Sequence, residues 1–531
     1  MRTINMVCVI ASFVLFFSAN LFSQKSGDFQ TATTGQWNAI ATWQTYNGSA
    51  WVAATKAPNG SENITIQATD SIDVNVPVTI TGYLKSLSGR IGNSAANLTF
   101  GNNGTYEHAV NGGNAPVATW GTGSTYLITG VTANAPSNSS QNFYNVTWNC
   151  PNYGGSAVNL GWNKTTIGGN LTVYGAPTRT GLRLTASAIG NAIPGGNVLT
   201  INGDVILADY NAYLTATGSS GIDTIAVYVK GNITSHGDFR LANGSGCMSN
   251  WYVSGNVNIL GGDMTTNSNT TSLPDSFIFN GTSKQTFYKA DSVGSISNVM
   301  FALRPGAIVD LSTTSIGGSL TTFTQPSGTT LLTSHPRGLK GNLSMQGSIK
   351  LPVNGNYEYN ALVAQVDSLL PSTVNNLTIN NPTTVSFVKA DTINGVLTLK
   401  QGTLDNSVNA ITIGTGGSVV FAGGKTTVPI PGWTSVKDVS VAPREFKLYN
   451  NYPNPFNPST QIRFSVPKDG FTSLRVMNIL GQEVATLFEG YAKAGNFLEV
   501  MFDARNLSSG IYFARLQQEG KISIQKMNLI K

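Results

Sequence analysis

The sequence predicts an all-β protein in which a right-handed parallel β-helix, or solenoid, is followed by an antiparallel immunoglobulin-like β-sandwich. Three observations support this fold class. Charged residues make up only 11% of the 531 residues, whereas 40% are hydrophobic and 58 are Gly. Short runs alternate apolar residues with Thr, and similar runs recur along the chain. An uncharged polar surface with β-branched residues and Gly turns is typical of β-structure.

Residues 24–435 form the predicted solenoid body. Four of its runs share the order Gly-Asn-apolar-polar, and they begin at Gly169, Gly231, Gly255 and Gly341. The second and third are 24 residues apart, and two similar runs at Leu377 and Leu397 are 20 apart. Intervals of this size are typical of coils that bury their apolar faces by stacking on their neighbours. A string of β-sandwiches would use the same alternation and is the competing fold.

The first 23 residues are predicted to be a signal peptide. Arg2 supplies a positive charge, and Val7 to Phe17 form an apolar run of eleven residues. That run is shorter than the about 20 residues that a membrane-spanning helix needs. Small and polar residues follow, so we place cleavage near Ser23 and Gln24. A buried N-terminal strand is the alternative interpretation.

Three tryptophans, Trp37, Trp43 and Trp51, lie within fifteen residues near the start of the body. Flat aromatic faces stack on sugars, so a sugar-binding platform is one interpretation. The open end of a solenoid also has to be covered by a cap. We favour the cap.

The composition changes near the C-terminus. Residues 436–447 are predicted to be a linker, and residues 448–531 a separate domain. Pro453, Pro455 and Pro458 exclude a helix at its start. Six short alternating segments follow, at residues 461–466, 474–479, 483–487, 497–502, 511–516 and 522–527. Short strands separated by Gly turns predict an immunoglobulin-like sandwich.

The order of motifs in residues 444–531 resembles the type A C-terminal sorting domain of the type IX secretion system. The motifs are Tyr452–Thr460, Leu474–Val484, Ala494–Asp503, Leu507–Leu516 and Lys526–Lys531. Met501, Phe502 and Asp503 stand where many members carry a Val-Trp-Asp-like run. The residues that carry the sorting motif are Tyr452, Pro453, Asn454, Pro455, Phe456, Asn457, Pro458, Gly481, Gln482, Gly495, Gly510, Tyr512, Lys526 and Lys531.

The resemblance implies an exported protein that is secreted or held at the outer-membrane cell surface. The implied partners are the type IX secretion translocon, a cell-surface sortase and a surface polysaccharide to which the sortase attaches its product. The body, above all residues 374–381, 391–399 and 402–404, resembles the β-helical stalks of secreted Bacteroidetes-type surface proteins. Its N-terminal motifs, from Gly35 to Ile66, are similar to the first module of such proteins.

The body shows no clear catalytic pattern. His108, His236 and His335 have no metal-ligand spacing, so we predict no metal, no cofactor and no assigned catalytic residue. Acids and bases in successive predicted coils could still align, as glycosidases need two nearby carboxylates. These candidates are Asp204, Asp209, Asp223, Asp238, Asp263, Lys230 and Arg240. Cys150 and Cys247 either pair or remain buried free thiols.

The net charge of +6 is thinly spread and forms no Lys/Arg cluster, so we do not expect nucleic-acid binding. The leading hypothesis is a non-enzymatic adhesin or matrix-binding solenoid whose ligand is an extracellular glycan or another surface molecule. The alternative is a β-helical polysaccharide lyase or glycoside hydrolase delivered by the same route.

Overall fold

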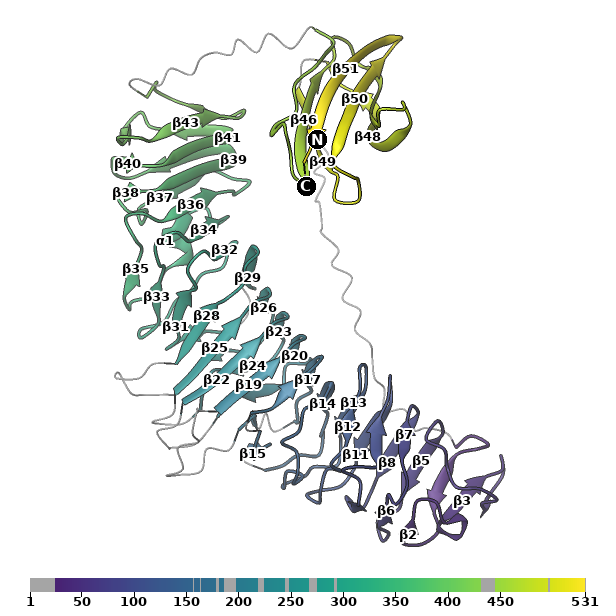
Figure 1. Cartoon of the computed structure of the whole chain (residues 1–531). Coiled ribbons are helices and arrows are strands. Elements are labelled where there is room, and N and C mark those ends of the chain that lie inside the picture. The colour runs from purple at the N-terminus through teal and green to yellow at the C-terminus, as the bar shows by residue number, and fades with distance from the viewer. Residues whose placement is uncertain are drawn as a thin grey trace, which may run out of the picture. The chain divides into compact units, whose positions relative to one another are not determined.

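A computed structural model shows an all-β chain with about 2% helix (Figure 1). The structure describes residues 24–155, 157–162, 164–177, 181–185, 197–217, 224–243, 248–266, 275–290, 294–430, 445–494 and 497–530. The chain divides into two compact units, residues 1–428 and 429–531. The predicted signal peptide, Cys247, Asp223 and most of the predicted linker lie outside the described residues.

The first unit is a parallel β-solenoid of about 14 turns, which confirms the predicted fold of the body. Its coils stack through a long sheet in which each strand pairs with the equivalent strand of the next coil (Figure 1). Along the stack the strands are β1 (Phe29–Thr31), β5 (Asn63–Ile66), β8 (Tyr83–Ser86), β11 (Thr105–His108), β13 (Thr125–Ile128), β14 (Asn145–Trp148), β17 (Leu171–Val173), β20 (Val205–Leu207), β23 (Ile233–Ser235), β26 (Val257–Ile259), β29 (Gln285–Lys289), β32 (Ile308–Asp310), β34 (Thr330–Thr333), β36 (Asn356–Tyr359), β39 (Asn376–Phe387), β41 (Val396–Asp405) and β43 (Ser418–Phe421). The spacing of 20 to 30 residues inferred from the Gly-Asn repeats is therefore the length of most coils.

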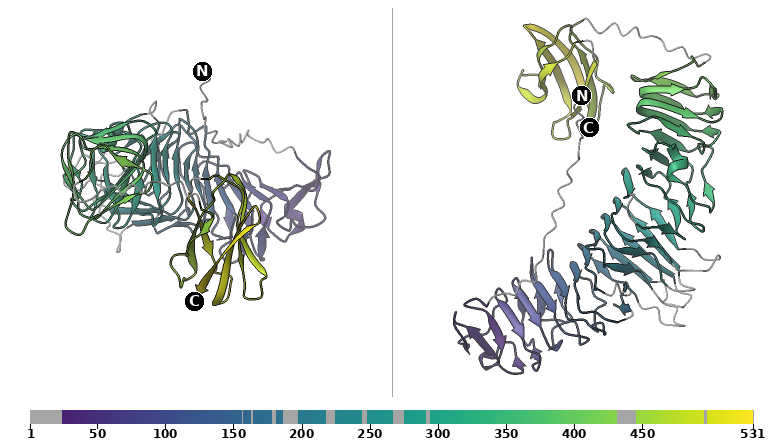
Figure 2. Two further views of the ribbon diagram at one scale, coloured as in Figure 1. Left: turned by 90° about the horizontal axis from the view of Figure 1, so that it is seen from above. Right: turned by 180° about the vertical axis from the view of Figure 1, so that it is seen from behind.

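Other parallel sheets complete the coils (Figure 2). One contains β16 (Thr166–Ile167), β19 (Asn197–Ile201), β22 (Thr224–Val229), β25 (Met248–Val253), β28 (Ser276–Phe279), β31 (Met300–Leu303), β33 (Thr322–Thr324) and β35 (Ile349–Lys350). Another contains β15 (Ala157–Asn159), β18 (Gly181–Arg183), β21 (Tyr213–Thr215), β24 (Asp238–Arg240), β27 (Met264–Thr265) and β30 (Ile296–Ser297). Shorter strands are β2 (Gly35–Gln36), β6 (Ile72–Asp73), β9 (Ile91–Gly92), β7 (Val78–Ile80), β10 (Leu98–Phe100), β12 (Thr119–Trp120), β37 (Gln365–Asp367), β38 (Thr373–Val374), β40 (Asp391–Ile393), β42 (Ile411–Ile413) and β44 (Lys425–Thr426).

The interior of the solenoid is filled by the apolar residues of the alternating runs. In β25, for example, Trp251 and Val253 are fully buried. Aromatic rings of successive coils pack on one another, as Phe277 and Phe301 do with ring centroids 5.8 Å apart. Each coil therefore relies on its neighbours to remove its apolar side chains from water, which is the physical reason for a repeat array.

The Gly-Asn repeat forms a corner that links one coil to the next. The side-chain Oδ1 of Asn170 accepts the backbone N–H of Asp204 at 2.8 Å, and that of Asn232 accepts the N–H of Asn256 at 2.8 Å. The preceding glycine is required because a Cβ at Gly231 would lie 2.4 Å from the Oδ1 of Asp204. The sequence motif thus encodes a close approach between coils and the side chain that caps it.

The fourth Gly-Asn pair, at Gly341 and Asn342, does not form this corner, so its grouping with the other three was wrong. It lies in the short helix α1 (Gly338–Asn342). There the Asn342 side chain donates to the carbonyl oxygens of Ser312 and Thr314 at 3.1 and 2.7 Å. The side chain still joins two coils, but by donating hydrogen bonds from a helix.

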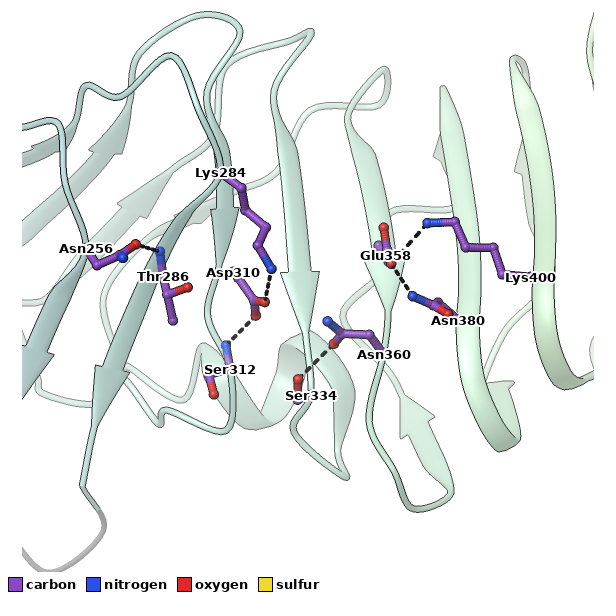
Figure 3. Close-up of polar contacts among 10 residues, drawn as sticks. All are labelled: Asn256, Lys284, Thr286, Asp310, Ser312, Ser334, Glu358, Asn360, Asn380 and Lys400. Carbon is purple, nitrogen blue, oxygen red and sulfur yellow. Dashed lines mark hydrogen bonds and ion pairs between the residues drawn. The ribbon is translucent and has the colours of Figure 1, made fainter. Parts of the chain in front are cut away.

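Further polar contacts join the outer edges of the coils (Figure 3). Lys284 lies 3.2 Å from Asp310, and Lys400 lies 3.5 Å from Glu358. Glu358 also accepts a hydrogen bond from Asn380 at 2.8 Å. Such partly exposed ion pairs contribute little stability each, about 0–1 kcal/mol, so the buried interior dominates the stability of the stack.

The N-terminal end of the solenoid is covered by β3 (Trp43–Tyr46) and β4 (Trp51–Ala53), which pair antiparallel beside the 3-10 turn η1 (Ile40–Thr42). Trp37 and Trp43 are buried and pack edge to face at 5.2 Å. Their indole N–H groups donate to the backbone carbonyls of Pro58 and Trp37. These two rings thus belong to the cap and offer no face to a sugar.

One buried carboxylate, Asp391, is expected to make the stability of the solenoid depend on pH. Asp391 at the start of β40 is only 2% exposed, and neither of its side-chain oxygens has a hydrogen-bond partner within the described residues. Burial raises its pKa to about 7; the charge of Lys389 opposes this shift, and that of Asp367 adds to it. The folded body therefore holds a proton there that an unfolded Asp, with a pKa near 3.9, releases.

We therefore expect the body to lose stability as the pH rises from about 4 to about 7, and to change little from this source above pH 7. Below about pH 4 the carboxyl is protonated in both the folded and the unfolded state. Between about pH 4 and pH 7 only the folded state keeps the proton, so a rising pH favours unfolding. Asp391→Asn should raise the melting temperature at pH 8 and flatten the dependence on pH. Thermal melts of both proteins between pH 4 and pH 9 test this, and a parallel pH dependence in the two would contradict it.

The second unit contains two antiparallel sheets, consistent with a β-sandwich. One sheet joins β45 (Lys447–Leu448), β46 (Ser459–Ser465) and β49 (Phe497–Asp503); the other joins β48 (Glu483–Ala492), β47 (Gly470–Met477), β50 (Gly510–Gln518) and β51 (Lys521–Leu529). All six predicted strands are present. Residues of both sheets, among them Phe464 and Leu516, share one buried core.

Candidate functional site

The structure brings several of the predicted acids together in a hollow on the solenoid, here called the acidic hollow. Asp209, Asp238 and Asp263 line a space of about 420 Å³, together with His236 and the exposed ring of Tyr210. The segments that carry these residues belong to successive coils, which is why residues about 25 apart in sequence meet here. The sequence indicates the acids as candidates but not His236, because its spacing from them matches no motif.

Each of these carboxylates serves the backbone of a neighbouring coil. Asp209 accepts the N–H of Gly175 at 3.0 Å, Asp238 accepts the N–H of Asp263 at 3.0 Å, and Asp263 accepts the N–H of Ser295 at 2.6 Å. Carboxylate oxygens that accept backbone N–H groups stabilise turns by giving these donors a partner within the protein. The hollow is therefore bordered by structural caps that are continuous with the stacking of the coils.

Of the other candidates that the structure describes, Arg240 contacts this set, whereas Asp204 and Lys230 lie elsewhere. Arg240 lies 3.8 Å from Asp238 and covers the ring of Tyr213 at 5.0 Å, so it neutralises one edge of the acidic hollow. Asp204 belongs to the Gly-Asn corner, where it accepts the N–H of Asn232 at 2.6 Å. Lys230 lines a second hollow.

This second hollow, here called the tyrosine groove, has a volume of about 470 Å³ and lies on the outer face of β22 and β25. The rings of Tyr228 and Tyr252 stack in it, with centroids 4.7 Å apart and planes 11° from parallel. Lys230, Asn280 and Arg304 lie beside them. The sequence does not single out this pair, although the two tyrosines are 24 residues apart and each precedes the Gly of a Gly-Asn repeat by three positions.

His108 and the Cys150 thiol are both buried in the solenoid, away from the two hollows. His108 is buried, contacts the hydroxyl of Tyr106 at 3.1 Å and the carbonyl of Gly112 at 2.7 Å, and burial lowers its pKa. Burial raises the pKa of the Cys150 thiol to about 12, which makes it a poor nucleophile. Within the described residues, no three His, Cys, Asp or Glu side chains are grouped closely enough to hold a metal ion.

The predicted sorting motif begins in the loop before β46 and meets the last strand of the chain. Asn454 donates its side-chain N–H to the carbonyl of Lys526 and accepts the N–H of Asn528 at 2.9 Å. Phe456 is buried against Phe502. The peptide bonds before Pro453 and Pro455 are cis. The loop is thus attached to β51, although 72 residues separate Asn454 from Lys526.

Other motif residues form turns or surface. Gly481 has a positive φ of 75°, which Gly adopts at little cost, in a turn closed by hydrogen bonds between Asn478 and Gln482. The hydroxyl of Tyr512 donates to the carbonyl of Ser508 at 2.8 Å. Tyr452 is 82% exposed. The other motif residues are Pro455, Asn457 and Pro458 in the same loop, Gly510 at the start of β50, and Gly495 and Lys531 outside the described residues.

No helix among the described residues is both long and apolar enough to span a membrane. No curated protein and no solved structure matches this chain. The family model of the secretion system C-terminal sorting domain, however, matches residues 450–531. This match covers the loop, the turn and the final strands just described. The solenoid is therefore followed by a C-terminal sorting domain, which marks the chain for export by type IX secretion to the cell surface or the extracellular space.

Proposed function

We propose that this protein is a non-enzymatic adhesin or matrix-binding protein whose solenoid presents a binding face outside the cell. The observation that carries the proposal is the use of the carboxylates in the acidic hollow. Asp209, Asp238 and Asp263 each accept a backbone N–H of another coil. A catalytic acid or base has to exchange protons with the substrate, whereas each of these carboxylates already accepts a backbone N–H that joins two coils.

The partners of export form part of the same proposal. An outer-membrane translocon reads the sorting domain, and a cell-surface sortase removes it and attaches the body to a surface polysaccharide. The exposed Tyr452 and the loop attached to β51 provide a surface for such recognition.

The second candidate function is a polysaccharide lyase or glycoside hydrolase. It is favoured by one observation, the presence of His236 and three carboxylates around a single hollow. We expect no product when the full-length protein is incubated with neutral and acidic polysaccharides and the reducing ends and unsaturated sugars are measured.

Substitutions in the hollow separate the two functions. Asp263→Asn retains an oxygen that accepts the Ser295 N–H, so we expect a stability close to that of the wild type. Asp263→Ala leaves that exposed donor to water and should cost about 0.5–1 kcal/mol. Denaturant unfolding measures both variants. Turnover that Asp263→Asn abolishes while the fold is retained would instead establish an enzyme.

A further inference from the structure

We propose that the tyrosine groove binds an acidic linear polysaccharide along the solenoid axis. This inference rests on the proposed binding function and names its ligand class. The groove lies on a different sheet from the acidic hollow, and its lining residues differ entirely from those of that hollow.

The tyrosine pair supplies the apolar part of the groove. Tyr228 is 36% exposed, and its strand neighbours are Tyr252 on one side and Thr200 on the other. A threonine is too short to cover a tyrosine ring that stands on the sheet. The ring face of Tyr228 toward Thr200 therefore remains available for stacking against the C–H face of a sugar ring. Within the described chain, neither tyrosine hydroxyl has a hydrogen-bond partner, so both are free to bind sugar hydroxyls.

A polar row runs beside the tyrosines. Lys230, Ser254, Asn280 and Arg304 each follow directly after a strand of four successive coils, and each donates its backbone N–H to the coil before. The row therefore follows the axis of the solenoid. Because neighbouring strands lie about 4.8 Å apart, the two cations at its ends are roughly 14 Å apart. A linear chain that lies along the row contacts several coils at once.

The charges of the row select an anionic ligand. Lys230 and Arg304 are exposed, and neither forms an ion pair within the described residues. None of the residues that line the groove is acidic. Arg304 uses one N–H to reach the Oδ1 of Asn280 at 3.3 Å, which leaves further guanidinium donors for a ligand. Two unpaired cations with amide, hydroxyl and aromatic groups between them match carboxylate or sulfate groups spaced along a polysaccharide.

Binding of the full-length protein to polyuronate, sulfated, neutral and cationic polysaccharides tests the proposal by isothermal titration calorimetry. We expect binding to the uronate or sulfated chains that weakens as salt is raised, because the exposed ion pairs are screened. The double variant Lys230→Gln/Arg304→Gln should bind roughly tenfold more weakly. Tyr228→Ala should lower the affinity by a similar factor, and Tyr228→Phe by less, since it retains the ring.

Two matched controls separate binding from folding. Lys350→Gln removes a cation from the same sheet outside the groove, and Tyr210→Ala removes an exposed ring of the acidic hollow; neither should change the affinity. Thermal melts of each variant establish that it is folded. Equal binding by Tyr228→Ala and the wild type would show that the tyrosine stack only stabilises the sheet. Tighter binding to single-stranded DNA than to any polysaccharide would replace the proposed ligand.

The results also distinguish this inference from the proposed function. Absence of binding to every acidic polysaccharide would overturn the inference but leave a non-enzymatic surface protein. Cleavage of a bound polysaccharide would overturn the proposed function, whereas loss of binding in the groove variants would still assign the ligand to this face.

Discussion

Removal of residues 444–531 is expected to leave a folded solenoid that accumulates in the periplasm instead of reaching the cell surface or the medium. The C-terminal domain has its own buried core and forms a compact unit separate from the solenoid. Its removal should therefore cost the coils little stability. Export should fall to background because the matched sorting domain, residues 450–531, is absent. Fractionation of a host that has the secretion machinery, with protease resistance of the retained body, measures both effects.

The reciprocal experiment is a reporter fusion. Residues 444–531 placed behind a signal peptide and a fluorescent protein should carry the reporter out of the cell. A matched fusion with Phe456→Ala tests whether the loop must be anchored, since Phe456 is 2% exposed and packs against Phe502. Normal yields of the truncated body in the medium would show that another part of the chain directs export.

A large loss of stability is expected for Gly231→Ala in the Gly-Asn corner. The added Cβ would lie 2.4 Å from the Oδ1 of Asp204 and 2.4 Å from the carbonyl carbon of Gly203. The second of these atoms belongs to the backbone of the preceding coil and moves only if the coils separate. We expect a cost of about 2–4 kcal/mol, from overpacking and from the strain on the ladder of hydrogen bonds.

Gly154→Ala is the matched control, because no atom lies within 4 Å of the Cβ it would add. It should leave the stability unchanged or raise it slightly by restricting the unfolded chain. Denaturant unfolding and limited proteolysis compare the two variants. Equal stabilities would mean that the coils separate at little cost and that the glycine repeat has another cause.

The sequence alone predicts much of the architecture because its signals are local. Alternation in runs such as Ile64–Ile66 sets which side chains face inward, and this alternation holds wherever the strand lies. The glycine turns and alternating segments of residues 461–527 likewise predict six strands that are all present. The sorting domain is identifiable because its motifs keep a fixed order in a short segment, and the family match confirms it.

The corner at Gly231 shows where local information is insufficient. The repeated pair is visible in the sequence, but its cause is the neighbouring coil, whose Asp204 occupies the space that a Cβ would need. The Gly341-Asn342 pair shows the same insufficiency of local information. Their local pattern is the same, but the surrounding coils place them in a helix.

The sequence by itself determined the fold class, the stacking interval and the destination of this protein, since these depend on periodicity and on a contiguous motif. Only the tertiary structure decided the roles of individual polar residues. Asp238 and Asp263, which the sequence offers as catalytic candidates, accept backbone N–H groups of neighbouring coils, and the coil length brings the rings of Tyr228 and Tyr252 to 4.7 Å. In a solenoid with coils of unequal length, the residues that meet across coils follow from the register of the stack, and that register is set by the packing of the interior as a whole.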